Sequence, residues 1–279
     1  MPYSINITAQ NMKFPNTTVW ITGASSGIGE ALAHAFAHAG AQLILSARRS
    51  NELERVKADC MRSSGAPAER FLILPLDLAD AASLPNKTQE ALRWRGSVDI
   101  MIHNGGVSQR SLAKETTIDV DRRIMEVDFF GTVALTKALL PSMIQQRRGH
   151  LVVISSLVGK FGTPMRSGYS AAKHALHGFF DALRAETHKD GIAVTIICPG
   201  FIKTQVSVNA VTGDGSAQGI MDNAQANGMS AEECAKRILK AVSTKKLEVY
   251  IGGRETIGIY LKRFVPTLFA RILRNAKVT

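Results

Sequence analysis

Short apolar runs rich in β-branched residues alternate with segments of helical periodicity along almost the whole chain. The runs predicted to be strands span residues 19–21, 43–45, 71–74, 98–102, 151–154, 193–198 and 247–251. The segments predicted to be helices span residues 30–38, 51–63, 81–94, 118–146, 168–189 and 230–242. In the first of these helices Ala31, Leu32, Ala35 and Phe36 share one face. A regular order of strand and helix leaves few architectures open to the chain.

Strands that are apolar without interruption are typical of a parallel sheet with both faces covered. We therefore predict an α/β fold, a doubly wound Rossmann fold with about seven parallel strands and helices on both faces. No internal repeat or linker divides the 279 residues, so we expect one domain over 1–279. Outside the pattern lie an N-terminal extension (1–16), a loop rich in Gly, Asn and Ser (203–229), and a basic apolar tail (254–279). We expect the loop to be mobile and to close over bound substrate.

Composition excludes several other classes of protein. Hydrophobic residues make up 45% and charged residues 20% of the chain, which is the balance of a globular protein. Cys60, Cys198 and Cys234 lie far apart without CxxC spacing, so we expect a reducing compartment and neither a disulfide framework nor a zinc knuckle. His174 and His177 share a helix face without a third ligand, so we expect no metal site.

The formal net charge of +11 is compatible with nucleic acid, an anionic membrane surface or an anionic substrate as partner. No nucleic-acid-binding motif or stripe of aromatic and basic residues is present, so we expect no nucleic acid partner. The first residues do not have the pattern of a signal peptide, and no uncharged apolar run approaches the ~20 residues of a spanning helix. We expect a cytoplasmic protein that does not cross a bilayer, with peripheral contact to a membrane left open.

A glycine-rich turn, Thr22–Gly29, joins the first strand to the first helix. Gly23 allows a tight turn, Gly27 lets the backbone approach a pyrophosphate, and Gly29 lets the helix pack closely on the sheet. The helix N-terminus then offers free N–H groups and a positive dipole end to phosphate. An ordinary strand-to-helix turn is the alternative, but the surrounding strand–helix–strand unit favours a dinucleotide. The contacts are predicted at Gly23, Ser25, Ser26, Gly27, Ile28 and Gly29.

The end of the second strand distinguishes the two nicotinamide dinucleotides. A site for NAD usually carries an acid there, which binds the ribose hydroxyls. This chain has Arg48 and Arg49 and no acid. A guanidinium can bind the 2′-phosphate of NADP(H) through two hydrogen bonds. We predict NADP(H) as cofactor, with Arg48 as the main contact and Arg49 as a second candidate; a pair of solvated surface arginines is the alternative.

Tyr169 and Lys173 lie four residues apart at the start of a predicted helix, so their side chains share one face. A phenol with an ordinary pKa of ~10 is a poor acid–base catalyst at neutral pH, and a neighbouring ammonium brings it toward the working range. Ser156 ends the fifth strand, at the edge where ligands bind in such sheets. Its hydroxyl can hydrogen-bond a carbonyl oxygen that gains negative charge.

These residues resemble the short-chain dehydrogenases/reductases over about residues 18–251. The motifs that carry the resemblance are TGASSGIG at 22–29, NGG at 104–106, ISS at 154–156, YSAAK at 169–173 and PGFIKT at 199–204. The segments LSARR, NGGVSQRSL, GTVALTKALLP and KHALHGFFDALRAE are most similar to one branch of the family. That branch contains 11β-hydroxysteroid dehydrogenase type 1 and member seven of the mammalian dehydrogenase/reductase series, with its bacterial relatives.

The resemblance implies hydride transfer between a nicotinamide and a carbonyl or alcohol. Ser156 would polarise the carbonyl, Tyr169 would transfer the proton, and Lys173 would bind the ribose and lower the pKa of the tyrosine. The resemblance also implies cofactor contacts by Asp77 at the adenine end, Asn104 and Gly105 near the adenosine ribose, and Pro199, Gly200, Ile202 and Thr204 around the nicotinamide. It implies a homodimer or homotetramer.

Two residues depart from the family pattern. His103 stands before Asn104, where we expect it to pack or hydrogen-bond at a strand end and not to catalyse. Asp128 stands at the fourth catalytic position, where the family normally has an asparagine that supports a helix kink and a water-linked proton relay. An ionised aspartate keeps the acceptors and loses the amide donors. We expect reduced but real activity; the alternative is a dinucleotide-binding regulator or scaffold with little catalysis.

The resemblance places the substrate cleft among residues 107–112, 157–166 and 205–229. Arg110, Lys160, Arg166 and Lys203 lie there or beside it, as ligands of an anionic substrate or as surface charges. The tail mixes large apolar residues with cations, and Pro266 is expected to break it into two short helices. Its composition suits a membrane interface, although packing on a subunit or over the cleft remains the alternative. We therefore expect an apolar or lipidic carbonyl substrate and, given NADP(H), reduction.

Overall fold

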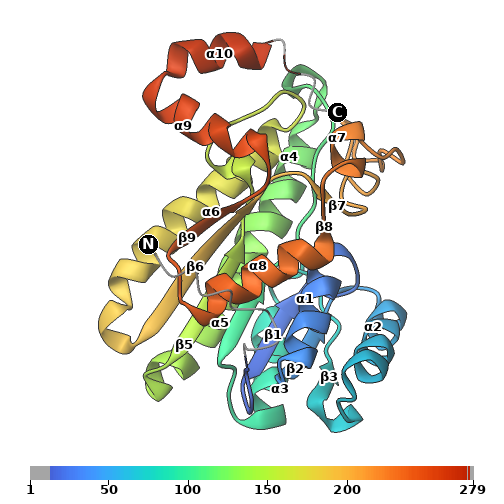
Figure 1. Cartoon of the computed structure of the whole chain (residues 1–279), viewed down its shortest axis with the longest axis vertical. Coiled ribbons are helices and arrows are strands. Elements are labelled where there is room, and N and C mark those ends of the chain that lie inside the picture. The colour runs from blue at the N-terminus through green and yellow to red at the C-terminus, as the bar shows by residue number, and fades with distance from the viewer. Residues whose placement is uncertain (1–12, 275, 277–279) are drawn as a thin grey trace, which may run out of the picture.

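The computed structural model describes residues 13–274 and 276. Seven parallel strands form one sheet in the order β3-β2-β1-β4-β5-β6-β9 (Figure 1). The strands are β1 (Thr18–Thr22), β2 (Gln42–Ser46), β3 (Phe71–Ile73), β4 (Ile100–His103), β5 (Gly149–Ile154), β6 (Ile192–Pro199) and β9 (Glu248–Ile251). The order reverses between β1 and β4, which is the switch point of a doubly wound sheet. The predicted fold is confirmed.

Helices cover both faces of the sheet, and the two apolar faces of each strand explain why. On β1, Val19 and Ile21 belong to one buried cluster and Trp20 to the other. The first cluster is closed by α1 (Gly27–His38), α2 (Ser50–Ser64) and α8 (Ala231–Ser243). The second is closed by α3 (Leu84–Arg95), α5 (Gly131–Gln146) and α6 (Ser167–Glu186). A strand between two such layers has no polar face, as its sequence indicates.

The predicted helix over 118–146 is not one continuous α-helix. It comprises α4 (Ile118–Met125), a π-helical turn (Glu126–Phe130) and α5. By length and composition the run Ile118–Gln146 is apolar enough to span a membrane, but 44% of its most apolar window is buried inside the protein. Leu135, Leu139 and Met143 are fully buried against the sheet. In this structure the run serves as a core helix.

The segment 203–229 is irregular, with three short elements at or beside its ends. These are β7 (Ile202–Lys203), α7 (Asn223–Ala226) and β8 (Met229–Ser230), and β7 pairs with β8. Ser230 then caps α8 as predicted, since its Oγ accepts a hydrogen bond from Glu233 N at 3.2 Å. Short 3-10 turns occupy Ala68–Arg70, Ala113–Glu115, Leu157–Gly159, His188–Asp190 and Arg254–Thr256.

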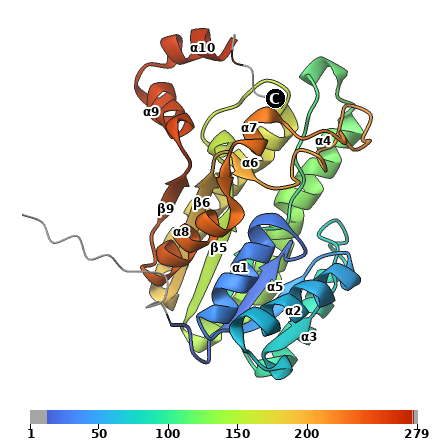
Figure 2. The ribbon, with the colours of Figure 1, turned by 45° about the vertical axis from the view of Figure 1, so that its right-hand side comes forward.

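The tail follows β9 and lies beyond the carboxyl ends of the strands (Figures 1 and 2). It forms α9 (Ile257–Phe264) and α10 (Pro266–Arg274), so the predicted break at Pro266 is confirmed. Of the expected N-terminal extension, residues 1–12 lie outside the described residues, as do 275 and 277–279 of the tail.

Candidate active site

A cleft of about 730 Å³ opens at the carboxyl ends of β1, β4 and β5, where such sheets bind ligands. It brings together residues predicted from five separate motifs. The predicted residues that line it are Gly23, Ser25, Ser26, Gly27, Ile28, Arg48, Arg49, Asp77, Asn104, Gly105, Asp128, Ser156, Tyr169, Lys173, Pro199, Gly200, Ile202 and Thr204. Gly29 is the exception. A Cβ there would lie 2.1 Å from the carbonyl oxygen of Gly23, so this glycine serves the packing of α1 and does not face the cleft.

The glycine turn leaves space for a ligand because side chains cannot fill it. Gly23 and Gly27 have φ of 66° and 58°, which favours glycine. A Cβ on Gly23 would lie 2.8 Å from Asn104 Nδ2. Asn104 braces the turn, since its Nδ2 donates to the carbonyl oxygens of Thr22 (3.0 Å) and Gly23 (3.3 Å). This glycine cradle and the N-terminus of α1 beside it fit a diphosphate.

Arg48 and Arg49 follow β2 at the far end of the same cleft and are both exposed. No carboxylate pairs with either guanidinium among the described residues. Ala47 follows the strand directly and lines the cleft, so no acidic side chain stands at this position. The donors here therefore fit a phosphate on the adenosine ribose better than bare ribose hydroxyls.

Ser156 lies directly beyond β5, at the opening of a 3-10 turn. Its Oγ accepts a hydrogen bond from Val158 N and donates to the carbonyl oxygen of Pro199, each at 3.3 Å. The hydroxyl is thus held between the end of β5 and the end of β6. Its weak, long bonds leave it able to turn toward a ligand.

Tyr169 and Lys173 lie on the first turns of α6, and Lys173 is 4% exposed. The Nζ of Lys173 is 5.4 Å from the centroid of the Tyr169 ring. It also donates to Ile154 O at 3.3 Å and contacts Asp128 Oδ2 at 3.2 Å. An ammonium has three N–H groups, so one is left for the cleft. Burial lowers the pKa of Lys173, but the charges of Asp128 and Tyr169 outweigh it and raise the pKa above its usual value.

Asp128 is fully buried in the π-helical turn, which places the kink where the family resemblance expects it. Its Oδ1 accepts a hydrogen bond from Val107 N at 2.7 Å. Burial raises the pKa of this carboxyl, against the opposing effects of Lys173 and Val107 N–H. The carboxyl and the ammonium titrate as one unit. With the pKa of Lys173 raised, we place the proton on the lysine at neutral pH.

Gln109 holds the start of α6 and was missed by the sequence motifs. It is fully buried, and its Oε1 accepts hydrogen bonds from Gly168 N (2.8 Å) and Tyr169 N (3.3 Å). Its Nε2 donates to three hydroxyls, including Thr116 Oγ1 at 3.0 Å. Free N–H groups at a helix start need such an acceptor. The only signal in the sequence was that Gln109 lies in the segment directly after the NGG motif.

Behind Ser156 a second polar network joins α6 to β9. Ser155 Oγ lies 3.0 Å from His177 Nε2 and donates to Lys173 O at 3.4 Å. His177 Nδ1 lies 3.6 Å from Glu248, whose carboxylate also pairs with Lys160 at 3.0 Å. Lys160 is thereby an ion-pair partner inside the protein. His177 is 7% exposed and packs in this network.

The expectations for Arg110 and Arg166 were wrong. Neither lines the cleft, and neither is a surface charge, since their side chains are 3% and 6% exposed. Both bind Asp222 Oδ2, Arg110 at 2.6 Å and Arg166 at 3.3 Å. Asp222 belongs to the segment 203–229, so one carboxylate joins all three segments expected to surround the substrate. Burial lowers the pKa of Arg166 to about 10, with Arg110 adding to the effect.

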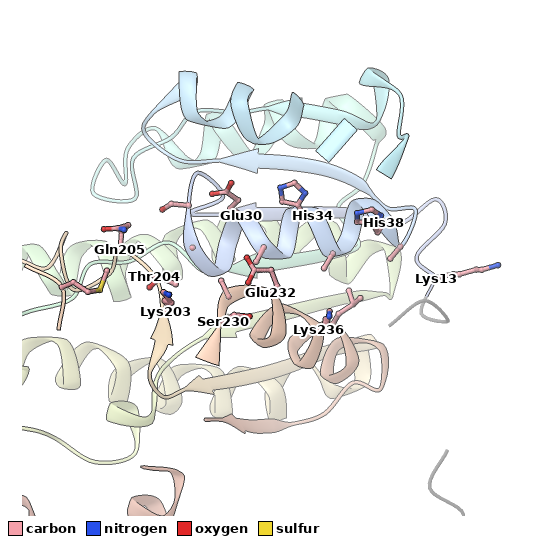
Figure 3. Close-up of a pocket in the computed structure, with 18 residues that line it drawn as sticks. Lys13, Glu30, His34, His38, Lys203, Thr204, Gln205, Ser230, Glu232 and Lys236 are labelled. Atoms are coloured by element: carbon pink, nitrogen blue, oxygen red, sulfur yellow. The ribbon is translucent and has the colours of Figure 1, made fainter. Parts of the chain in front are cut away.

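The remaining candidate residues, His103 and Lys203, do not line the cleft. His103 is buried at the end of β4 and hydrogen-bonds Thr136 Oγ1 at 2.8 Å, so the packing interpretation is confirmed. Over residues 13–274, no group of three or more His, Cys, Asp or Glu residues could hold a metal ion. Lys203 lies at the end of a second hollow, a groove of about 980 Å³ between α1 and α8 (Figure 3). That groove lacks Ser156, Tyr169 and Lys173.

A cleft at the switch point, with a diphosphate cradle at one end and a serine, tyrosine and lysine at the other, defines an oxidoreductase built on a dinucleotide-binding fold. The family model of the short chain dehydrogenases matches residues 17–214. The chain belongs to this family.

Two relatives indicate which branch of the family this chain resembles. A dehydrogenase/reductase SDR family protein 7-like of Drosophila melanogaster is 46% identical over 267 residues, which cover 95% of this chain and 82% of the relative. Family member 7B of Mus musculus is 44% identical over 261 residues, which cover 93% of this chain and 81% of that one. The resemblance to member seven is confirmed.

Solved structures agree on the fold. A short chain dehydrogenase/reductase of Burkholderia phymatum, crystallised with NAD, has a TM-score of 0.80 at 21% identity and covers 92% of this chain and 96% of its own. A short-chain dehydrogenase of Streptomyces avermitilis has a TM-score of 0.76 at 27% identity, covering 93% and 96%.

Proposed function

We propose that the protein is an NADP(H)-dependent reductase that transfers hydride to the carbonyl of an apolar or lipidic substrate. The observation that carries this proposal is the convergence of Ser156, Tyr169 and Lys173 on one cleft with the glycine turn. Membership of the short-chain dehydrogenase family supports the reaction class.

When bound, the nicotinamide supplies the hydride, and the protein supplies orientation and the proton. Ser156 Oγ sits at the strand end with a rotatable hydrogen, so it can donate to a carbonyl oxygen that becomes an alkoxide. Tyr169 then gives its phenolic proton to that oxygen. Lys173, held by Ile154 O and Asp128, keeps its charge beside the Tyr169 ring and stabilises the phenolate that remains.

Asp128 gives the site a feature of its own. Its carboxylate neutralises part of the Lys173 charge and fixes the ammonium at 3.2 Å. We propose that it is an adapted part of the site, in which the carboxylate accepts a hydrogen bond from Val107 N–H and forms an ion pair with Lys173 that a neutral amide cannot form. Replacement Asp128→Asn is then expected to lower turnover. Equal or higher turnover in Asp128→Asn would contradict this role.

The preference for NADP(H) rests on Arg48, with Arg49 as a second contact. Neither is engaged by a carboxylate, and no acid follows β2. A phosphate bound there would satisfy both guanidinium groups, which otherwise stand exposed and close in sequence.

The rest of the proposal rests on the sequence and on the family resemblance. The enzyme is one domain that acts in the cytoplasm as a homodimer or homotetramer, and residues 203–229 form its substrate loop. Residues 254–279 make peripheral contact with a membrane. An apolar carbonyl compound would be concentrated at such a surface. Reduction is the direction that NADP(H) favours.

The rival proposal is a regulator that binds the dinucleotide without catalysis. The specific feature behind it is Asp128 at the position of the usual asparagine. A regulator needs the glycine turn but not the buried ion pair that holds Lys173 beside Tyr169. We therefore favour the enzyme.

The test is the loss of NADPH or NADH absorbance with a panel of aldehydes, quinones, steroid ketones, retinal and acyl-dihydroxyacetone phosphate. We expect turnover with NADPH on at least one apolar member, and lower turnover with NADH. Tight NADPH binding without turnover in wild type, with turnover restored in Asp128→Asn, would favour the regulator, whereas no turnover in either protein would mean that the panel lacks the substrate.

A further inference from the structure

Half of the exposed large apolar side chains lie in the tail. Over residues 13–274 twelve such side chains are exposed, and six of them form what we call the tail patch. The tail patch consists of Ile257, Tyr260, Phe264, Val265, Leu268 and Ile272. Each is at least 46% exposed, and Phe264 reaches 75%. Large exposed apolar side chains gathered in one short segment indicate an interaction site.

The tail patch lies on the side of each helix that faces away from the protein. On α9, Ile257, Tyr260 and Phe264 recur at helical spacing, whereas Ile259 is the buried residue. On α10, Leu268 and Ile272 are one turn apart, and Phe269 is buried. Ile259 and Leu261 of α9, with Phe269 and Leu273 of α10, thus pack on the body of the protein. On each helix a second apolar face stays exposed, and there the Tyr260 ring lies 6.5 Å from the Tyr250 ring.

The tail packs on the segment that follows Ser156 and on the residues after β6. Phe269 packs edge-on against Phe161 at 5.2 Å between ring centroids, and Gly258 lies against the same ring. Phe161 belongs to the segment after Ser156. At its start the tail is tied to the residues after β6, since Glu255 accepts a hydrogen bond from Phe201 N at 3.3 Å. Figures 1 and 2 show α9 and α10 beyond the carboxyl ends of the strands, and the cleft opens at the same edge of the sheet.

Charge identifies the partner. Residues 256–274 contain Lys262, Arg263, Arg271 and Arg274 and no acid. All four cations are exposed, and none pairs with a carboxylate in the described chain. A second copy of this chain would place like charges against one another, whereas an anionic lipid surface neutralises them. Apolar residues flanked by cations also suit the boundary of headgroups and acyl chains.

We propose that the tail patch docks on an anionic membrane surface and holds the mouth of the cleft toward the lipid. The inference deepens the membrane contact of the proposed function and assigns it to one face of α9 and α10. Lipid docking needs neither cofactor nor turnover, so its failure is distinguishable from failure of the proposed reaction.

The test is co-sedimentation of the full chain with vesicles, without substrate. One set consists of phosphatidylcholine alone, and the other of equal parts of phosphatidylcholine and phosphatidylserine. We expect binding to the anionic set, weakened by salt. Phe264→Asp should lower the bound fraction roughly 10-fold or more, because it removes a large apolar contact and adds a repelled charge. Lys262→Glu with Arg263→Glu should reduce binding by at least ~10-fold.

The matched control is Leu247→Asp, a side chain 63% exposed before β9, at the other end of that strand from the tail. It should bind vesicles as wild type does, as should Tyr169→Phe. Equal binding of wild type to both vesicle sets would overturn the anionic partner. Absent binding, together with an oligomer that Phe264→Asp dissociates in sedimentation velocity, would overturn the proposal in favour of a second copy.

Discussion

The two ends of the cleft are built in different ways. At the nucleotide end, neighbouring strand ends are joined by hydrogen bonds, such as those from Asn104 to the carbonyl oxygens of Thr22 and Gly23. Next to the substrate end, but outside the lining of the cleft, Arg110 and Arg166 converge on the buried carboxylate of Asp222, although the three residues are distant in sequence. The first arrangement is specified by a local motif. The second depends on long-range charge pairing that no local pattern encodes.

The largest effect on stability is expected at the substrate end. Asp222→Asn leaves the cations of Arg110 and Arg166 buried without their carboxylate, which should cost about 3–5 kcal/mol in the free energy of unfolding. Urea denaturation measures it. The control is Asp214→Asn in the same segment, where the carboxylate is exposed and stability should not change. Similar losses of unfolding free energy in the two variants would contradict the stabilising role of the ion pairs between Asp222 and the two arginines.

At the nucleotide end the expected effect is on affinity. Arg48→Ser removes charged hydrogen bonds to a 2′-phosphate, and NADPH should bind about 10- to 100-fold more weakly. NADH lacks that phosphate, so its affinity should stay the same. Isothermal titration with both nucleotides separates the cases. An equal loss for NADH would mean that Arg48 acts on the fold and not on the phosphate.

As pH falls, the buried histidines of the sheet are expected to lower stability before the Asp222 cluster loses its contribution. Burial lowers the pKa of His103 to about 3 and of His150 to about 4, so both are neutral when folded. The unfolded chain binds protons below the ordinary histidine pKa of about 6.5, so stability falls as pH drops below that value. Each histidine should contribute about 2 kcal/mol of loss by about pH 5.

Asp222 behaves differently in the same range. Burial opposes its ionisation, but hydrogen bonds from Arg110 and Gln218 keep the pKa of this carboxyl below its usual value. Its contribution to stability is therefore present at mildly acidic pH and is lost only as pH falls through that lowered pKa.

The loss of stability expected from His103 is checked by the melting temperatures of wild type and His103→Gln across pH. An unchanged pH slope in the variant would contradict the assignment to His103.

The smallest expected effect is at the junction of the two ends. Gln109→Glu keeps an acceptor for the start of α6, loses the donors and adds a negative charge near Tyr169. We expect kcat to fall about tenfold and the high-pH limb of its profile to move to higher pH, because a like charge disfavours the phenolate. The KM for NADPH should not change. A fall in kcat with an unshifted profile would reduce Gln109 to a structural role.

Local chemistry explains which features the sequence could predict. The apolar strands, the glycine turn and the four-residue spacing of Tyr169 and Lys173 follow from periodicity and backbone geometry. The partners of Lys173 and the acceptor for the start of α6 do not. Asp128 and Gln109 reach α6 only once the sheet is assembled, and their neighbours are far away in sequence.

The charged residues around the substrate illustrate the limit most clearly. From the sequence, Arg110 and Arg166 were interpreted as cations that either bind substrate or lie on the surface. In the structure both are buried and form ion pairs with Asp222. An acid inside a Gly-, Asn- and Ser-rich segment carries no signal that it will be buried. The break in the tail was easier to predict, because Pro266 and the mixture of large apolar residues with cations are local properties of the sequence.

The central claim is that Tyr169, held beside Lys173, gives the proton in an NADPH-dependent reduction. The most direct measurement is turnover by Tyr169→Phe on whichever carbonyl compound wild type reduces, together with the Kd for NADPH. We predict that kcat falls roughly 10³-fold, within the range of a lost general acid, while the Kd changes little because the phenyl ring still lines the cleft. Turnover close to wild type in Tyr169→Phe would contradict the account.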